Sequence, residues 1–186
     1  KETLDMSIEQ IEEQIVREIE VEIGHSGIRA GFIGEIGVSH ILFPFEEKSL
    51  IGACRAQVRT GAPLMIHINP WSTQGIKAMD IVKEPPRNPP ASVRPRWVRV
   101  HRRWSSVSRL LDMGVYIEFD NWGKEMFTDR WDVKPGSGRF VNDWERSLLV
   151  KKIMDRGYEK QMLLSTDLCL KSLLHKYGGW GYDHIL

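Results

Sequence analysis

Three side chains of types that bind metal ions each accompany a short apolar run in this sequence. They are Glu35 within residues 31–37, His67 after residues 62–66 and Asp167 after residues 161–166. A short apolar run bounded by glycines is typical of a buried strand in a parallel sheet. A lone carboxylate there is costly unless a cation or hydrogen-bond donors meet it. The pattern therefore predicts a metal centre at the C-terminal ends of the strands.

Each of these residues also has a structural interpretation. Glu35 could be a buried carboxylate satisfied by the backbone or by an arginine, since structural ion pairs also use such groups. His67 could be a core histidine, and Asp167 could cap the following helix. The metal interpretation gains weight only because all three residues accompany runs of the same kind.

Composition indicates one soluble globular domain and excludes several function classes. The chain has 186 residues, 41% hydrophobic and 27% charged, with a net charge of +1, so nothing steers it generally toward nucleic acid. Cys54 and Cys169 form neither a disulfide framework nor a metal-binding spacing, which predicts a reduced, cytoplasmic setting. No apolar run reaches the roughly 18 residues of a membrane span. We therefore expect neither nucleic acid nor membrane as a partner.

Helical and strand patterns alternate along the chain. Helices are expected at 7–22, 44–60, 72–83, 104–113 and 141–156, and strands at 30–36, 62–68, 115–120 and 161–166. Such alternation indicates right-handed parallel crossovers. Metal-type ligands at strand ends favour an α/β fold of the (β/α)8 barrel type, with a doubly wound sheet as the competing fold. Five strands at most can be counted, so the barrel would be incomplete.

Two of these helices carry clear signals at their ends or on their faces. Ser7 and Gln10 form a capping-box pair at the start of the first. In helix 141–156, we expect Trp144, Leu148 and Ile153 to face inward.

The segment 85–103 interrupts the alternation. It holds five of the nine prolines and six arginines, and proline is poorly tolerated inside a sheet. Only residues 97–101 could form a strand there. A nucleic-acid patch is a weak alternative, because prolines separate the arginines and no series of stacking aromatics accompanies them.

Five motifs carry a resemblance to a known family: residues 30–37, 60–67, 117–125, 164–167 and 178–183. Together, and in this order, they resemble the phosphotriesterase-related branch of the amidohydrolase superfamily, the metal-dependent hydrolases. The resemblance covers nearly the whole chain apart from 85–103.

This resemblance implies a (β/α)8 (TIM) barrel with two divalent metal ions, usually zinc. Glu35 matches the strand-four carboxylate that bridges the metals, and His67 matches the strand-five metal histidine. Asp167 matches the strand-eight aspartate, which binds metal and, as the catalytic residue, takes a proton from the bridging hydroxide. The implied reaction is attack of metal-bound hydroxide on an ester, lactone, amide or phosphoester of a small-molecule substrate.

The chain departs from the family pattern in two places. The strand-one His-x-His pair has no counterpart, and Trp97 stands where the strand-six histidine belongs; the role is not assigned to His101. Residues 1–186 are therefore expected to be the C-terminal part of a single hydrolase barrel, about strands four to eight, with 85–103 disturbed by a reading-frame or gene-model error. The alternative function is a catalytically inactive truncated fragment, and the full-length parent could be a homodimer.

The remaining polar and aromatic candidates have local interpretations. Glu118 and Asp120 are expected to be structural or to belong to the substrate loop. Trp122, Trp180 and Tyr182 would either line a substrate pocket or pack within their loops.

Overall fold

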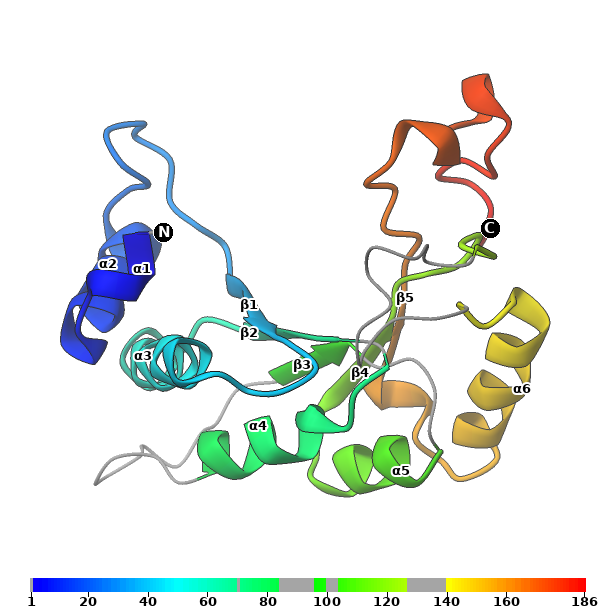
Figure 1. Ribbon diagram of the computed structural model, residues 1–186, viewed down its shortest axis with the longest axis horizontal. Coiled ribbons are helices and arrows are strands. Elements are labelled where there is room, and N and C mark those ends of the chain that lie inside the picture. Colours follow the sequence, from blue (N-terminus) through cyan, green and yellow to red (C-terminus); the bar gives the residue numbers. More distant parts are fainter. Residues whose placement is uncertain (1, 70, 84–95, 100–103, 127–139) are drawn as a thin grey trace.

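A sheet of five parallel strands, in the order in which they occur along the chain, forms the centre of the molecule (Figure 1). The computed structural model describes residues 2–69, 71–83, 96–99, 104–126 and 140–186. The strands are β1 Ile33–Val38, β2 Leu64–Ile68, β3 Arg96–Arg99, β4 Tyr116–Phe119 and β5 Met162–Leu164. The α-helices are α1 Glu2–Asp5, α2 Ile8–Glu20, α3 Pro44–Thr60, α4 Gln74–Lys83, α5 Trp104–Asp112 and α6 Asp143–Met154. Short 3-10 helices are η2 Glu159–Gln161, η3 Lys171–Leu173 and η4 His175–Tyr177.

The helices α3, α4 and α5 lie side by side on one face of the sheet (Figure 1). Strand β2 shows why: Leu64, Ile66 and Ile68 are at most 4% exposed and form part of the core. Side chains alternate between the faces of a strand, so Met65 and His67 point to the opposite face, where both are only partly buried. The face opposite these three helices thus carries His67, one of the predicted metal ligands.

Local signals set the helix ends as expected. In α2, the Gln10 amide donates to Ser7 Oγ at 3.2 Å, and the Ser7 amide donates to Gln10 Oε1 at 2.7 Å, which confirms the capping box. Helix α3 begins at Pro44 and is followed by Gly61 at φ 67°, a left-handed conformation that glycine adopts without strain.

The expectation that the Glu35 stretch is a buried strand ending near that residue is wrong in two respects. Strand β1 runs on to Val38, so Glu35 lies inside it. Ile33 and Val38 are buried, but Gly34, Glu35 and Gly37 are exposed, and Phe32 just before the strand is 44% exposed. The cause is position: β1 is an edge strand, paired only with β2, so its second edge has no neighbouring strand within the described sheet.

The predicted inner face of α6 is also wrong. Trp144 is 71% exposed and Leu148 52% exposed, whereas Ile153 is fully buried as expected. The buried stripe instead runs through Arg146, Leu149, Val150 and Ile153, positions three or four residues apart that share one helix face. The prediction failed because the charged residue Arg146 lies on the buried face. That face is rotated by about half a turn from the one that Trp144 and Leu148 indicated.

The proline- and arginine-rich segment 85–103 falls outside the described residues except for β3. The backbone of β3 pairs in parallel with β2 and β4, so the doubtful strand of this region is part of the sheet. Neither Cys54 nor Cys169 forms a disulfide within the described part of the chain. Across the described ranges, no helix combines the length and hydropathy of a membrane-spanning segment.

Candidate metal centre

Glu35 and His67 meet on neighbouring parallel strands. Gly37 of β1 lies opposite His67 of β2, and the register shifts between Ile33 and Ile36. This geometry brings Glu35 Oε1 to 3.4 Å from His67 Nδ1. Their side chains are 49% and 34% exposed, so a carboxylate and an imidazole share a site that solvent and ions can reach.

Asp167 lies beyond the end of β5 and pairs with a different group. It has φ 42°, a left-handed conformation unusual outside glycine. Its Oδ2 contacts the ammonium of Lys124, whose Nζ is also 3.5 Å from Cys169 Sγ. Among the residues that the structure describes, no three His, Cys, Asp or Glu side chains lie close enough together to hold a metal ion. The structure thus brings together two of the three predicted ligands and leaves Asp167 with Lys124.

The donor types of these groups suit a divalent metal. Imidazole and carboxylate are ligands that zinc and related ions accept, and catalytic zinc sites combine such groups with an open position. The partial exposure of Glu35 and His67 provides such an opening. At Asp167, the Lys124 ammonium shows that the carboxylate already attracts a cation.

The loop after β4 carries Lys124 and is fixed by the start of α6. The Gly123 amide donates to both oxygens of Asp143, at 3.1 and 3.2 Å. Arg146 contacts Asp143 Oδ1 with one nitrogen and donates to the Lys124 carbonyl at 3.0 Å with another. Burial lowers the pKa of the Arg146 guanidinium, and the neighbouring Asp143 charge opposes that shift. Arg146 is 2% exposed, so this is an interior anchor.

Sequence reasoning assigned no role to Lys124, Asp143 or Arg146. Lys124 lies within a family-like motif, but a lysine after a Trp-Gly pair gives no sign of an inward direction. Arg146 lies in α6, where the apolar residues Trp144 and Leu148 suggested that a different face of the helix is buried. Neither position carries a local signal that could have revealed its partner.

The C-terminal segment packs over the same loop. His184 Nε2 lies 2.5 Å from Asp143 Oδ2, and the rings of His184 and Trp180 are 4.8 Å apart. His175 Nε2 lies 2.6 Å from Asp183 Oδ1, and this hydrogen bond is the largest cause that lowers the pKa of Asp183. His175 thus bonds within the C-terminal segment, whereas His184 ties that segment to the start of α6.

The aromatic and acidic candidates in these loops differ in how deeply they are buried. Trp122 is partly buried against the core, whereas Trp180 and Tyr182 are 57% and 71% exposed. Asp120 is 2% exposed and accepts a hydrogen bond from the Asn121 side chain, which fits the structural role expected of it.

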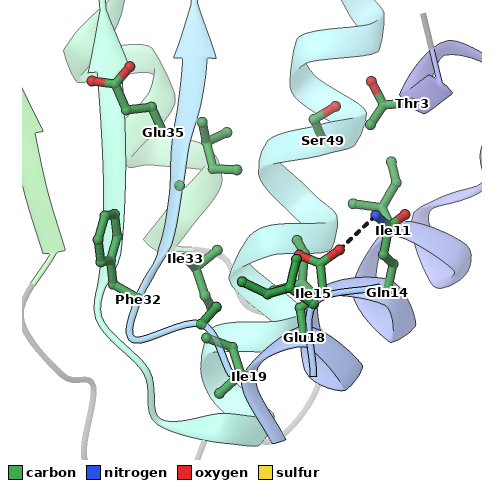
Figure 2. Close-up of a pocket in the computed structure, with 14 residues that line it drawn as sticks. Thr3, Ile11, Gln14, Ile15, Glu18, Ile19, Phe32, Ile33, Glu35 and Ser49 are labelled. Carbon is green, nitrogen blue, oxygen red and sulfur yellow. Dashed lines mark hydrogen bonds between the residues drawn. The ribbon is translucent and has the colours of Figure 1, made fainter. Parts of the chain in front are cut away.

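A pocket of about 380 Å³ lies along β1 on the side away from β2 (Figure 2). Its wall is largely apolar, with Ile11, Ile15 and Ile19 from α2 and Ile33 from β1. Figure 2 shows the Glu35 carboxylate pointing away from the helix side of this pocket. Glu35 is itself one of the residues that line the pocket, so the pocket adjoins the candidate metal site at this carboxylate.

Comparisons with known proteins give a consistent result. A model of the phosphotriesterase family matches residues 2–186. A phosphotriesterase-related protein of Nematostella vectensis is 31% identical over 96% of this chain and 50% of its own length. An N-acetyltaurine hydrolase of Bos taurus is 31% identical over 100% of this chain and 52% of its own length. The crystal structure of a resiniferatoxin-binding protein from Rhodobacter sphaeroides superposes with a TM-score of 0.86 at 32% identity, over 100% of this chain and 50% of that one. The chain therefore spans about half the length of these relatives.

Proposed function

The chain belongs to the phosphotriesterase family, and from that premise we propose that it is the C-terminal part of a metal-dependent hydrolase. The observation that carries the proposal is the approach of Glu35 Oε1 to His67 Nδ1, at 3.4 Å, on adjacent parallel strands. Two ligand types from separate parts of the sequence meet where the family resemblance places metal ligands. Asp167, at the end of β5, is the third.

Glu35, His67 and Asp167 would hold two divalent ions, with zinc as the expected metal. Such ions would polarise the substrate and make water nucleophilic near neutral pH. Glu35 would share its charge between the ions, and His67 would bind as a neutral imidazole. Asp167 would move a proton from the nucleophile toward the leaving group.

The incomplete barrel is part of the proposal. Five parallel strands in chain order, with helices on one face, are what strands four to eight of a (β/α)8 barrel would form, and they support this assignment. The apolar pocket beside β1 lies where a preceding strand would pair. The chain also covers about half of its relatives, which agrees with a missing set of strands one to three.

The substrate we propose first is a small amide, because a relative 31% identical is an N-acetyltaurine hydrolase. An ester, lactone or phosphoester is the alternative within the same chemistry. A cytoplasmic location, expected from the cysteine usage, and a homodimeric full-length parent are further proposals.

A catalytically inactive fragment is the second candidate. It is favoured by the separation of Asp167 from the other ligands, since the described residues hold no cluster of three metal-binding side chains. On this view the chain binds zinc weakly through Glu35 and His67 and turns over no substrate.

Zinc titration calorimetry on the full chain tests the site. We expect weak binding that is lost in Glu35→Gln and in His67→Asn, while Glu20→Gln, an exposed carboxylate of α2, keeps it. Equal zinc binding in the wild type and both site variants would refute the metal centre.

Activity separates the two candidates. N-acetyltaurine, a lactone and an aryl phosphotriester are assayed with the chain alone and with the chain joined to the half of the Nematostella relative that it does not span. Turnover only in the joined protein supports an incomplete hydrolase. No turnover in either would leave the inactive fragment as the better description.

A further inference from the structure

We propose that Lys124 is a positioning residue that holds the Asp167 carboxylate and competes with a divalent cation for it. The inference rests on the proposed function, because it gives Asp167 a metal to bind. Its consequence would be that Asp167 could hold an ion only if Lys124 moved away from it, whereas Glu35 and His67 would bind one without that displacement.

The backbone of Lys124 is held in place on both sides. Its amide donates to the Asn121 carbonyl at 3.0 Å, and its carbonyl accepts from Arg146 at 3.0 Å. The preceding Gly123 has φ 79°, and a Cβ there would lie 3.2 Å from Trp180 and His184. With its backbone fixed in this way, Lys124 extends its side chain toward the segment after β5, where it contacts Asp167.

The ammonium of Lys124 needs the Asp167 carboxylate. Lys124 is 5% exposed, whereas the Asp167 side chain is 27% exposed. A buried ammonium without a counter-ion is strongly disfavoured, so Lys124 stays on Asp167. The carboxylate, in contrast, remains accessible from solvent, and an incoming ion can reach it.

Two cations then compete for one carboxylate. A divalent ion on Asp167 would lie close to the Lys124 charge, and like charges at contact distance repel even in a medium of high dielectric constant. Removing the lysine charge removes this repulsion. The lysine is therefore expected to weaken metal binding at Asp167, although it keeps that carboxylate ordered.

The test is Zn²⁺ titration of the full chain in a Cys169→Ser background, because a thiol beside Asp167 could itself bind zinc. Lys124→Met, which keeps an unbranched side chain one atom shorter and removes its charge, should bind zinc about tenfold more tightly. Lys124→Arg should keep the parent affinity. The matched control is Lys160→Met, which removes the same charge from an exposed position in η2.

Three outcomes decide the inference. Tighter binding in Lys124→Met that disappears in the double variant Lys124→Met/Asp167→Asn supports it. Unchanged or weaker binding, or a gain that survives loss of Asp167, overturns it. Circular dichroism checks folding, and Lys124→Gln replaces the methionine variant if that variant does not fold.

The same titrations keep the two proposals apart. If the parent binds zinc through Glu35 and His67 while Lys124→Met binds no better, only the inference on Lys124 fails. If neither the parent nor Lys124→Met binds zinc, the proposed metal centre fails together with it.

Discussion

Replacing Arg146 by alanine should destabilise the protein more than any change to an exposed charge. Arg146 is 2% exposed, contacts Asp143 and donates to the Lys124 carbonyl. Breaking a buried ion pair by removing one partner costs about 3–5 kcal/mol. Asp143 would keep its hydrogen bonds with Gly123 and His184, so we expect the lower end, about 3 kcal/mol. In a domain of this size that corresponds to a melting temperature lower by about 6–12 °C.

Urea unfolding followed by circular dichroism measures this loss. Arg156→Ala is the matched control, since Arg156 is exposed and lies just after the same helix; it should change stability by less than about 0.5 kcal/mol. A cycle with Asp143→Asn should show coupling of about 0.5–3 kcal/mol between the two side chains. A loss below about 1 kcal/mol in Arg146→Ala would show that the anchor on the β4 loop does not depend on this arginine.

Three further changes test other parts of the fold. Gly34→Ala should lower the unfolding free energy by at least about 2 kcal/mol, because φ is 130° and the new Cβ would lie 2.6 Å from the Met65 carbonyl oxygen. Ile153→Ala should cost about 2–5 kcal/mol, because this side chain is fully buried. The hydrogen bond from His175 lowers the pKa of Asp183 below its ordinary value of 3.8, so its contribution to stability is present above that value and is lost as the pH falls through the lowered pKa. The stability difference between wild type and Asp183→Asn, measured by urea unfolding, should therefore shrink between about pH 5 and pH 2.

Each of these three tests has a control variant or an outcome that would contradict the expected result. Gly37→Ala adds a Cβ with nothing within 4 Å, so equal losses at the two β1 glycines would contradict the steric argument. Leu148→Ala, at a side chain 52% exposed, should be nearly neutral, and a loss as large as that of Ile153→Ala would restore the helix face predicted from sequence. A stability difference for Asp183→Asn that does not change with pH would show that this pair does not stabilise the fold through ionisation.

Structural features that depend on contacts within one helical turn or one strand could be predicted from the sequence. The Ser7–Gln10 capping box and the glycine at position 61 set helix ends through contacts with residues a few positions away. The alternation of helix and strand patterns likewise predicted a parallel sheet, which the strand pairings confirm. Glu35 Oε1 lies 3.4 Å from His67 Nδ1, and the role of the two residues as metal ligands, drawn from the family motifs, stays a prediction.

Features that depend on distant partners could not be predicted. The exposure of β1 follows from its place at the edge of the sheet, which its own glycine-rich sequence does not encode. The phase of α6 depends on Arg146, which is buried because Asp143 and the β4 loop meet it. The partner of Asp167, Lys124, lies far away in the sequence and has no pattern of its own.

The sheet order has a consequence for how this chain acquires its structure. Every pairing joins strands that follow one another in sequence, as Ile33 with Leu64 and Ile117 with Met162. Each such pair encloses a whole crossover of the chain, and parallel strand pairing of this kind is slow compared with helix formation. Within the described sheet, strands can therefore be added one at a time, each onto the strand before it, and we expect these parallel pairings rather than the helices to limit the rate of folding.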